Sequence, residues 1–598
     1  MVELTAEQIE KLRALGKTQK ANLLKAGDDF LAKKAGYIAS IYTCNATGCH
    51  SGGAENVINA FKESLEIFGL ADKVRMVATG CMGLCAKGPL ARIEINRREP
   101  FLYKEVDGDI ARLIVSEHIA PALEHPEREL KLSKRLMDKE LSLKLPFFTK
   151  QKRVVLEHLG HSDPEDLGEY VANGGYKALM HVLENMTPQQ VIEEIKKSGL
   201  RGRGGGGFST GMKWELLAKA PLVDGEKFVI CNGDEGDPGA YMDSCILSGG
   251  AHGVLEGMMI AAYATGATSG WFYVRAEYPL ALERVELAIK QAKKAGILGR
   301  NIFGSDFSFM ADLRYGAGAF VCGEETALMA SLEGRRGTPH PRPPYPTEKG
   351  LFDKPSIINN VETFANVPKI LTHGADWFAS MGTETSKGTK VFALTGKVHH
   401  SGLVEVPMGT TLNEMVNEIG GGTSSGKPFK AVQTGGPSGG VIPASKLDLQ
   451  LCYECLKNVG SMMGSGGMIV MDEADSMVEI AKFYLSFTVD ESCGKCAPCR
   501  LGGYQMLQLL KKIAAGLGSQ VDMDKIHEIA SAMQKAALCA LGQTAPNPVL
   551  STMRFFPEEY EALLLDTPID KTKKQCYVVS EVDKLMNTGA CKTCGGCK

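Results

Sequence analysis

Cysteines in closely spaced groups limit how this chain can fold more than any other feature of its sequence. The chain has 17 cysteines in 598 residues, and most fall in three groups: near the N-terminus, in the C-terminal part and at the very end. These are too few for a disulfide scaffold of this length. Short, repeated spacings are typical of thiolate metal ligands instead. The sequence therefore predicts several metal-binding cysteine sites joined to larger folded domains.

The N-terminal group contains two cysteine pairs that can converge on one centre. Cys44 and Cys49 lie in YTCNATGCHSGG, and Cys81 and Cys85 lie in TGCMGLCAKGP. Their small neighbours let backbone amides turn toward sulfide, which a cluster needs more than a four-coordinate zinc does. The pattern favours a [2Fe-2S] cluster over zinc. Its C-x4-C and C-x3-C spacings resemble the thioredoxin-like ferredoxin module.

The second group combines a C-x2-C-x2-C run with one distant cysteine. Cys493, Cys496 and Cys499 lie in ESCGKCAPCRLG, and Cys539 lies in LCALGQTAPNP. Four thiolates in this arrangement are what a [4Fe-4S] cluster requires, and Lys495 and Arg500 are expected to oppose its negative charge. Structural zinc is the less favoured alternative.

The third group lies at the end of the chain, in KQCYVV and ACKTCGGCK. Its C-x2-C-x2-C run resembles the first three ligands of a bacterial ferredoxin motif. A third cluster and a zinc knuckle are nearly equal alternatives, with a slight preference for the cluster. We expect a small lobe that metal binding stabilises, because the segment has little else to form a core. Its cysteines are Cys576, Cys591, Cys594 and Cys597.

Five cysteines stand outside these groups. Cys231, Cys245 and Cys322 have apolar or glycine-rich neighbours and are expected to be buried packing residues. Cys452 and Cys455, in LCYECL, are spaced like two metal ligands. A zinc shared with His527 or a tail cysteine is one interpretation of this pair, but a packing role is the favoured one.

A glycine-rich segment predicts close backbone approach to a ligand. Ser198 to Trp214 reads SGLRGRGGGGFSTGMKW, in a chain with 68 glycines. Missing side chains let backbone amides reach a phosphate or a flat ring. Positive charge is expected from Arg201, Arg203 and Lys213, and stacking from Phe208 and Trp214. A flexible loop is the alternative. The segment matches neither a dinucleotide-binding fingerprint nor a P-loop.

Carboxylates follow the strand-like run KFVIC in CNGDEGDPGAYMD. Asn232, Asp234, Glu235 and Asp237 at a strand end indicate a cation site, a sugar-hydroxyl site or a solvated turn. On spacing alone, the turn is the commonest of the three. The surrounding region alternates helical stretches with short apolar runs, a rhythm typical of α/β folds.

Charge and hydropathy exclude several classes of function. The net charge is only -3, which gives no electrostatic case for binding nucleic acid or an anionic membrane. The N-terminus mixes charges at helical spacing and does not resemble a signal peptide. The apolar stretch 257–274 is interrupted by Gly266 and Gly270, so we expect a buried helix and a buried strand instead of a membrane span. We expect a cytoplasmic protein.

Nine motifs, in order, resemble the family of NADH-oxidising flavin and iron-sulfur subunits of respiratory complex I. Within that family the sequence is most similar to the beta subunit of NAD-linked, often electron-bifurcating, iron-iron hydrogenases. The motifs are GLRGRGGGGFSTGMKW, CNGDEGDPGAYMD, WFYVRAEYP, RYGAGAFVCGEETALMASLEG, RPPYP, INNVET, GSGGMIVMDE, DESCGKCAPCR and LCALGQTAPNP.

The resemblance implies FMN and NAD(H) as cofactors beside the clusters. Hydride passes directly between nicotinamide and flavin, so no catalytic acid or base is implied. The flavin contacts implied by the motifs are Gly202, Gly204, Lys213, Asn232, Asp234, Asn359, Asn360 and Thr363. The implied nicotinamide-nucleotide contacts are Phe208, Asp237, Glu277 and Tyr345, with Glu324 and Glu325 closing the same pocket.

The expected fold is a multidomain α/β architecture. It comprises a thioredoxin-like [2Fe-2S] ferredoxin domain (1–125), a charged, solvated linker (126–153), an α/β FMN- and NADH-binding domain (154–375), a β-grasp, soluble-ligand-binding domain (376–445), a helical [4Fe-4S] domain (446–565) and a cysteine-rich metal-binding tail (566–598). The β-grasp assignment follows the resemblance of KVFALTGKVHHSGLVEVPMGTTLNEM to that module.

The expected function is that of a diaphorase subunit in a multi-subunit hydrogenase. The implied partners are a hydrogenase catalytic subunit and a small thioredoxin-like [2Fe-2S] subunit. The tail, with only three closely spaced cysteines, departs from relatives that end in a two-cluster ferredoxin domain, which leaves ferredoxin coupling, and with it electron bifurcation, open. One alternative is the same module serving an NAD-dependent formate dehydrogenase. Another is an electron-relay or scaffold subunit that binds no nucleotide.

Overall fold

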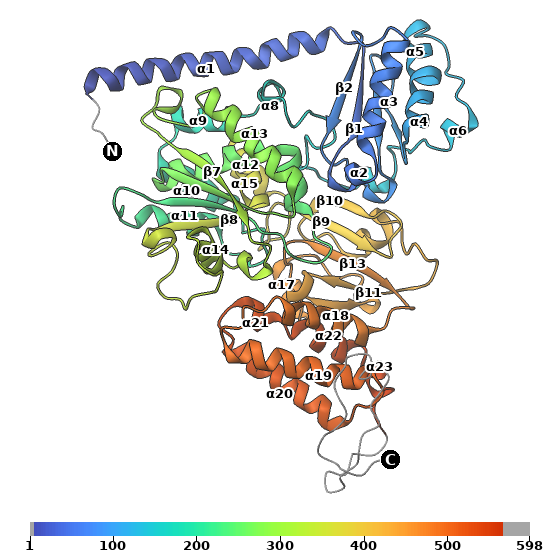
Figure 1. The fold of residues 1–598 in the computed structure, drawn as a ribbon, viewed down its shortest axis with the longest axis vertical. Coiled ribbons are helices and arrows are strands. Elements are labelled where there is room, and N and C mark those ends of the chain that lie inside the picture. Colours follow the sequence, from blue (N-terminus) through green and yellow to red (C-terminus); the bar gives the residue numbers. More distant parts are fainter. Residues whose placement is uncertain (1–4, 566–598) are drawn as a thin grey trace.

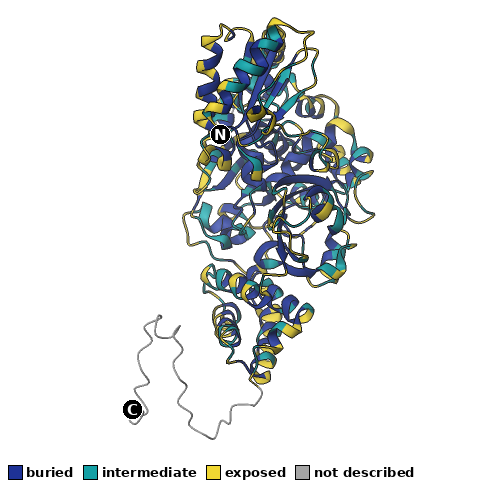
Figure 2. Cartoon of the chain, turned by 90° about the vertical axis from the view of Figure 1, so that its right-hand side faces the viewer, coloured by how far each residue is buried: buried dark blue, intermediate teal, exposed yellow. Residues whose placement is uncertain are grey.

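The computed structural model describes residues 5–565, which form three β-sheets and a C-terminal group of helices (Figure 1). The multidomain α/β architecture is confirmed. Buried residues run through the middle of the molecule, whereas many residues of the long N-terminal helix and the C-terminal helices are exposed (Figure 2). The tail cysteines Cys576, Cys591, Cys594 and Cys597 lie outside the described residues.

The first sheet has the strand order β2-β1-β3-β4. Strand β1 is parallel to β2 and antiparallel to β3, and β4 is antiparallel to β3. Every residue of β1 is buried, as expected for a central strand. The strands are β1 (Ala39–Cys44), β2 (Val74–Thr79), β3 (Ala91–Ile95) and β4 (Phe101–Tyr103), with α2 (Thr47–Ser51), α3 (Ala54–Ile67), α4 (Gly108–Leu113) and α5 (Ala120–Glu124) around them.

The expected extents of the first two segments need correction. Helix α1 (Ala6–Ala35) extends away from the first sheet and packs on α8 (Leu167–Ala172) and on the turn 302–304. The Cβ of any side chain at Gly16 would meet the backbone nitrogen of Gly304 at 2.4 Å. The linker is not wholly solvated, because Leu136 and Phe147 are fully buried in it. The many charged residues of this segment masked its few buried apolar side chains in the sequence.

The central sheet is entirely parallel, with the order β7-β6-β5-β8. Its strands are β5 (Phe228–Gly233), β6 (Ser269–Arg275), β7 (Met310–Gly316) and β8 (Ser356–Asn360). The surrounding helices are α9 (Lys177–Asn185), α10 (Pro188–Ser198), α11 (Thr210–Lys219), α12 (Met242–Thr265), α13 (Pro279–Lys294), α14 (Glu325–Leu332), α15 (Val361–His373) and α16 (Ala375–Ala379). Ligands bind such sheets at the carboxyl ends of the strands.

The predicted buried helix and buried strand within 257–274 are confirmed. Helix α12 ends at Thr265, Gly266 follows in the left-handed region at φ 74°, and β6 begins at Ser269. Among the described residues, α12 alone is long and apolar enough to cross a membrane, and 89% of its most apolar window is buried inside the protein.

Helix α12 packs closely on α15, which starts at the end of β8. The contact depends on Gly257, because a Cβ at this position would lie 2.1 Å from the carbonyl oxygen of Phe364. Backbone atoms cannot move aside as a flexible side chain can, so this crossing requires glycine. The crossing fixes the start of α15, and with it Asn359 and Asn360, relative to the sheet.

The third sheet is mixed and has the order β10-β9-β13-β11-β12. Its strands are β9 (Thr389–Gly396), β10 (Gly402–Pro407), β11 (Phe429–Thr434), β12 (Gly440–Pro443) and β13 (Gly467–Asp472). Since β13 lies between β9 and β11, the expected domain boundary at 445 is wrong and the sheet extends to 472. The run GMIVMD joins the sheet through a long-range parallel pairing with β9, which local sequence does not reveal.

Two buried carboxylates join the third sheet to the rest of the molecule. Glu362, on α15, pairs with the fully buried Lys390 and accepts a hydrogen bond from the Val391 amide at 3.0 Å. Glu405, on β10, accepts hydrogen bonds from the amides of residues 154–156 at 2.8 to 3.1 Å. Because a buried charge is costly unless it is satisfied, each contact fixes the relative position of two segments.

The remaining helices form the C-terminal group. They are α17 (Tyr453–Asn458), which lies before β13, and then α18 (Met477–Asp490), α19 (Gly503–Ala514), α20 (Gln520–Ala536), α21 (Ala540–Thr544), α22 (Asn547–Phe555) and α23 (Pro557–Glu561). Short helices α6 (Lys134–Met137) and α7 (Pro146–Thr149) lie in the linker. The predicted helical character after residue 473 is confirmed.

Replacing Gly257 with Val should destabilise the protein by about 1–3 kcal/mol, because the added side chain overpacks the crossing of α12 and α15. Thermal unfolding should show a lowered midpoint. Gly253→Ala on the same helix is the matched control, since its Cβ would meet only the Tyr170 hydroxyl at 3.7 Å. Equal midpoints for the two variants would contradict the assigned role of Gly257.

Candidate active site

A cavity of about 1030 Å³ opens at the carboxyl ends of β5 and β8. Amide side chains from both strands, a glycine loop and residues 345–348 surround it. Predicted site residues that line it are Gly202, Gly204, Phe208, Lys213, Asn232, Glu324, Glu325, Tyr345, Asn359 and Asn360. The sequence did not single out other lining residues, among them Leu216, Arg342, Glu348 and Ala540. Of these, Arg342 lies in the RPPYP motif, which was the one available signal.

The glycine loop, residues 201–207, fits its position because its five glycines lack side chains. A Cβ at Gly204 would lie 3.1 Å from the Asn360 Cβ, and one at Gly205 would lie 3.1 Å from the Gly464 Cα. Gly205 and Gly207 also have positive φ values of 116° and 62°, which disfavour side chains. The loop therefore presents backbone to the cavity on one side and touches other segments on the other.

Two arginines of the loop do not face the cavity, contrary to expectation. Arg201 pairs with Glu454 at 2.5 Å, and Arg203 is fully buried with its guanidinium donating to the carbonyls of Arg201 and Lys387. The Arg203 amide donates to Thr363 Oγ1 at 2.9 Å, so Thr363 supports the loop from behind. Both guanidinium groups pair with acceptors of the protein, whereas Lys213 lines the cavity.

Trp214 is also placed differently from its predicted stacking role. Its ring is fully buried, and Nε1 donates to Asn359 Oδ1 at 3.1 Å. That bond orients the Asn359 amide at the cavity wall. Phe208 and Tyr345, by contrast, are 54% and 53% exposed at the cavity, where a flat ring can stack on them.

Lys213 and two glutamates form the charged part of the lining. Lys213 Nζ donates to the Ile358 carbonyl at 2.6 Å and pairs with Glu325. Glu324 caps α14, accepting from the amides of Thr326 and Ala327 at 2.9 and 3.0 Å. Glu324 therefore both caps a helix and lines the cavity.

The carboxylates that follow β5 have separate roles, and none lines the cavity. Glu235 accepts from the amides of Asp243 and Ser244 at the start of α12, and Asp237 accepts from Ser465 Oγ at 2.8 Å. Burial raises the pKa of Glu235 to about 7 and that of Asp237 to about 6. These groups are therefore not a solvated turn.

Asp234 lacks any hydrogen bond to its side-chain oxygens within the described residues, and burial raises its pKa to about 7. Its nearest cation is Arg275, with Nε 3.9 Å from Oδ1. Arg275 also pairs with Glu277 at 2.9 Å. An unsatisfied buried carboxylate at a strand end is the feature expected of a group that awaits a ligand.

The second cysteine group surrounds a small cavity next to the large one. Cys493, Cys496, Cys499 and Cys539 all line it, and no carboxylate does. Lys495 lines it too, as expected, and Arg500 donates to the Gly494 carbonyl at 2.8 Å. Burial raises the pKa of the Cys539 thiol to about 11. Four thiols with no carboxylate among them fit an iron-sulfur cluster.

The N-terminal cysteines also lie together. Cys81 and Cys85 have their sulfur atoms 3.7 Å apart, and the Cys49 and Cys81 thiols lower the pKa of the Cys44 thiol. The Gly83 amide donates to Cys81 Sγ at 3.3 Å, as backbone amides do toward cluster sulfur. Within residues 5–565, however, no three His, Cys, Asp or Glu side chains are arranged around a single metal ion.

The isolated cysteines fall into two classes. Cys231, Cys245 and Cys322 are buried, as predicted. Cys452 and Cys455 are joined by a disulfide, so the zinc interpretation of this pair is wrong, and Cys452 is also buried. Each sulfur is bonded to the other, and His527 is exposed on α20.

Asp234 should make stability depend on pH. Its pKa rises from an ordinary 3.8 to about 7 in the folded protein, so the protonated form stabilises the fold below pH 4 and this contribution is lost as pH rises through 7. Between pH 5.5 and 8 the loss is about 2 kcal/mol. The unfolding midpoint of Asp234→Asn should therefore fall less over this range than that of the wild type. Parallel pH profiles would contradict the assignment.

Comparisons with known proteins agree with this geometry. Residues 195–369 match the Nuo51 FMN-binding domain, and residues 479–563 match the NADH-ubiquinone oxidoreductase-F iron-sulfur binding region. The chain is 51% identical to NADP-reducing hydrogenase subunit HndC of Solidesulfovibrio fructosivorans over 449 residues, covering 75% of this chain and 90% of that protein. It is 42% identical to an NADH-quinone oxidoreductase subunit of Rhizobium meliloti over 409 residues, covering 68% and 97%.

A solved structure has the same fold over most of the chain. The NAD+-reducing [NiFe]-hydrogenase in its air-oxidised state aligns with a TM-score of 0.62 and 28% identity, covering 89% of this chain and 86% of the matched one. The matched regions contain the cavity lining and the second cysteine group. The chain therefore belongs to the family of FMN-binding, iron-sulfur subunits that occur in NADH-quinone oxidoreductases and in hydrogenases that use nicotinamide nucleotides.

Proposed function

We propose that this chain oxidises NADH with FMN bound in the large cavity and delivers the electrons through iron-sulfur clusters to a hydrogenase-type complex. One observation carries the proposal. Ala540 lines the large cavity, and the preceding residue, Cys539, lines the four-cysteine cavity. A flavin and a [4Fe-4S] cluster bound in these two places would be neighbours. A cavity of this size also argues against a relay subunit that binds no nucleotide.

The lining residues suit FMN in their chemistry. Asn232, Asn359 and Asn360 offer amides to flavin and ribityl oxygens, Lys213 offers a cation, and the glycine loop offers backbone amides. FMN supplies the conversion between two-electron hydride chemistry and single-electron transfer. The protein's own task is to hold and orient two flat rings, which requires no general acid or base. Phe208 and Tyr345 suit the nucleotide bases at the rim.

Coenzyme choice differs among the relatives, because one is named NADP-reducing and the matched structure NAD+-reducing. We assign NADH to this chain. Glu277 would lie beside the adenosine ribose, where a carboxylate accepts hydroxyl hydrogen bonds and repels a 2'-phosphate. Asp237 and Asp234 are assigned to the same site, although neither lines the cavity in the described structure.

The proposal extends to the individual domains, the location of the chain and its partners. The first sheet and its four cysteines support a thioredoxin-like [2Fe-2S] domain, and the third sheet supports a β-grasp domain. We assign the chain to the cytoplasm. Its partners are a hydrogenase catalytic subunit and a small thioredoxin-like [2Fe-2S] subunit, with ferredoxin and electron bifurcation as a further proposal. The alternative, in which the chain serves a formate dehydrogenase complex, is distinguished from the hydrogenase by identifying the subunits that purify with it.

The purified chain should release FMN, identified by fluorescence, and should oxidise NADH with an artificial dye. Cys499→Ala should preserve both properties while lowering the iron content and abolishing the paramagnetic signal of the reduced [4Fe-4S] cluster, since it removes one thiolate ligand. Cys231→Ala, a buried cysteine in β5, should leave the iron content unchanged. Absence of FMN from the wild-type chain, or an unchanged signal in Cys499→Ala, would refute the proposal.

Glu277→Gln should reduce the preference for NADH over NADPH by about tenfold, which corresponds to about 1.4 kcal/mol. The substitution removes a negative charge and frees Arg275, its present partner, to meet a 2'-phosphate. The ratio of kcat/KM values for the two nucleotides measures the effect. Glu283→Gln, an exposed change on α13, is the charge-matched control. If the wild type already uses both nucleotides equally, Glu277 has no such role.

A further inference from the structure

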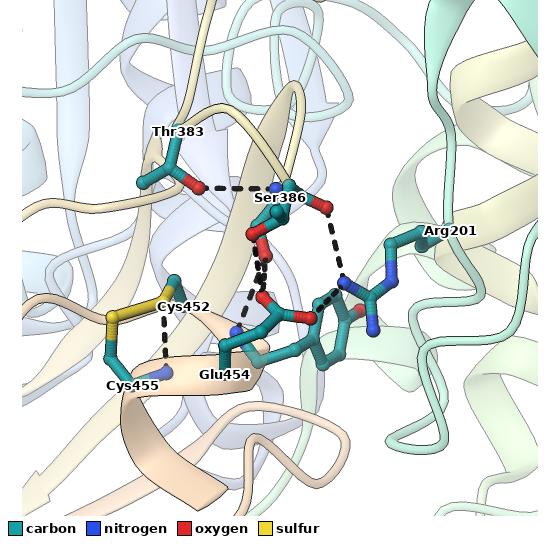
Figure 3. Close-up of a disulfide and its surroundings, with 8 residues drawn as sticks. Arg201, Thr383, Ser386, Cys452, Glu454 and Cys455 are labelled. Carbon is teal, nitrogen blue, oxygen red and sulfur yellow. Dashed lines mark hydrogen bonds and ion pairs between the residues drawn. A yellow bond between two sulfur atoms is a disulfide. The ribbon is translucent and has the colours of Figure 1, made fainter. Parts of the chain in front are cut away.

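The disulfide between Cys452 and Cys455 encloses only Tyr453 and Glu454, at the start of α17 (Figure 3). A disulfide that closes so short a loop removes little entropy from the unfolded chain. Its value as a staple for the fold is therefore small. Cysteines separated by two residues are, however, the arrangement in which dithiols and disulfides interconvert readily.

The two cysteines differ in exposure. Cys452 is buried, with 2% of its surface accessible, whereas Cys455 is only partly buried. Thiol–disulfide exchange begins with attack of a thiolate on an accessible sulfur. An external reductant can therefore reach the pair at Cys455, with Cys452 as the leaving group.

Tyr453, the first enclosed residue, holds the glycine loop directly. Its hydroxyl donates to the Gly202 carbonyl at 2.7 Å. Its ring lies under the Arg201 guanidinium, 4.2 Å from ring centroid to Cζ. A Cβ at Gly207 would come within 2.8 Å of the same ring, so ring and loop backbone are in close contact.

Glu454, the second enclosed residue, holds the loop through Arg201. Its carboxylate pairs with Arg201 Nη1 at 2.5 Å and also accepts from the hydroxyls of Thr385 and Ser386 at 2.8 and 3.0 Å (Figure 3). Arg201 Nε in turn donates to the Gly207 carbonyl at 2.6 Å. The disulfide thus encloses the two residues that clamp the loop from outside the cavity.

We propose that Cys452 and Cys455 form a reversible redox site whose oxidised form holds the glycine loop in place and whose reduction weakens nucleotide binding in the adjoining cavity. The second part rests on the proposed function, since it takes NADH as the occupant. Opening the disulfide removes the covalent ring around Tyr453 and Glu454. Their contacts to the loop then depend on a first turn of α17 that no covalent bond constrains.

The co-reactant is a dithiol reductant. One of its thiolates attacks Cys455 Sγ, the Cys452–Cys455 bond breaks, and Cys452 leaves as a thiolate that takes up a proton. The second thiol of the reductant then attacks the mixed disulfide and releases Cys455 as a thiol. The reductant ends as a disulfide, and two electrons and two protons have passed to the cysteine pair.

The first test concerns the bond itself and needs no NADH. Full-length protein is equilibrated anaerobically with oxidised glutathione or with dithiothreitol, then alkylated and digested. The tryptic peptide 447–457 contains Cys452 and Cys455 and no other cysteine. We expect an unalkylated disulfide peptide after oxidation and a doubly alkylated one after reduction. Two free thiols under both conditions would overturn the proposal.

The second test concerns coupling to the cavity. Hydrogen–deuterium exchange of residues 201–208 should quicken on reduction, and the KM for NADH should rise about threefold with little change in kcat. Cys455→Ser should show the reduced behaviour under both conditions. Because it keeps the cysteines assigned to clusters, it also controls for effects of dithiothreitol on clusters. Unchanged exchange at 201–208 while the disulfide opens would overturn the coupling.

Failure of the proposed function can be recognised separately. If the chain oxidises no NADH, the peptide analysis and the exchange of residues 201–208 still report on the redox site. Glu454→Gln provides an independent check, since it removes the Arg201 ion pair without touching either cysteine. It should quicken exchange at 201–208 and raise the KM even in the oxidised protein. Wild-type values in this variant would also contradict the clamp.

Discussion

The glycine loop can lie where it does only because neighbouring segments approach its backbone from several sides at once. Asn360 meets it from the central sheet, Gly464 from the approach to β13, and Tyr453 from α17. Any side chain at Gly204, Gly205 or Gly207 would force one of these apart. The central sheet, the third sheet and α17 are thus positioned against a single strip of bare backbone. The shape of the cavity depends on how tightly that strip is held.

Charge pairing around the loop serves this positioning more than it serves a ligand. Arg203 is entirely buried, and it bonds to carbonyls of the loop and of residue 387. Arg201 is bound by Glu454 on one side and by the Gly207 carbonyl on the other. A basic residue in a glycine-rich loop is therefore not by itself evidence of phosphate binding. Here acceptors within the protein pair with both guanidinium groups, and Lys213 lines the cavity.

The structure could be predicted from the sequence where a local pattern is compatible with only one fold of the backbone. The division of 257–274 into α12 and β6 could be predicted because Gly266 and Gly270 interrupt an apolar run. Strand β13 could not be assigned to the third sheet, because its pairing with β9 spans a long stretch of chain. The course of α1 was hidden for a similar reason. Its partners, near Val171 and Gly304, are distant in sequence.

The residues of the site could be predicted from the sequence to a similar extent. Motif order correctly indicated the amides and glycines that line the cavity, since these residues act through backbone or through short polar groups that few environments tolerate. It did not predict that Trp214 orients Asn359 or that Thr363 supports the loop, because both effects depend on three-dimensional packing. The bond between Cys452 and Cys455 was missed because cysteines two residues apart fit metal ligands, packing and a disulfide equally well.

Helix α12 and the segment after Cys539 connect two cysteine groups that are far apart in sequence to the same cavity. Tyr241 and Cys245, at its start, contact Cys85 and Cys81 of the N-terminal group. The loop that leads into the helix carries Asp234 from the end of β5, where Asn232 lines the cavity. On another part of the cavity wall, Ala540 follows Cys539 directly. The large cavity therefore has a short covalent connection to the second cysteine group and a packed connection, through α12, to the first. The close crossing of α12 on α15 holds the packed connection in place beside the cavity, because neither helix can shift without a clash between Gly257 and Phe364.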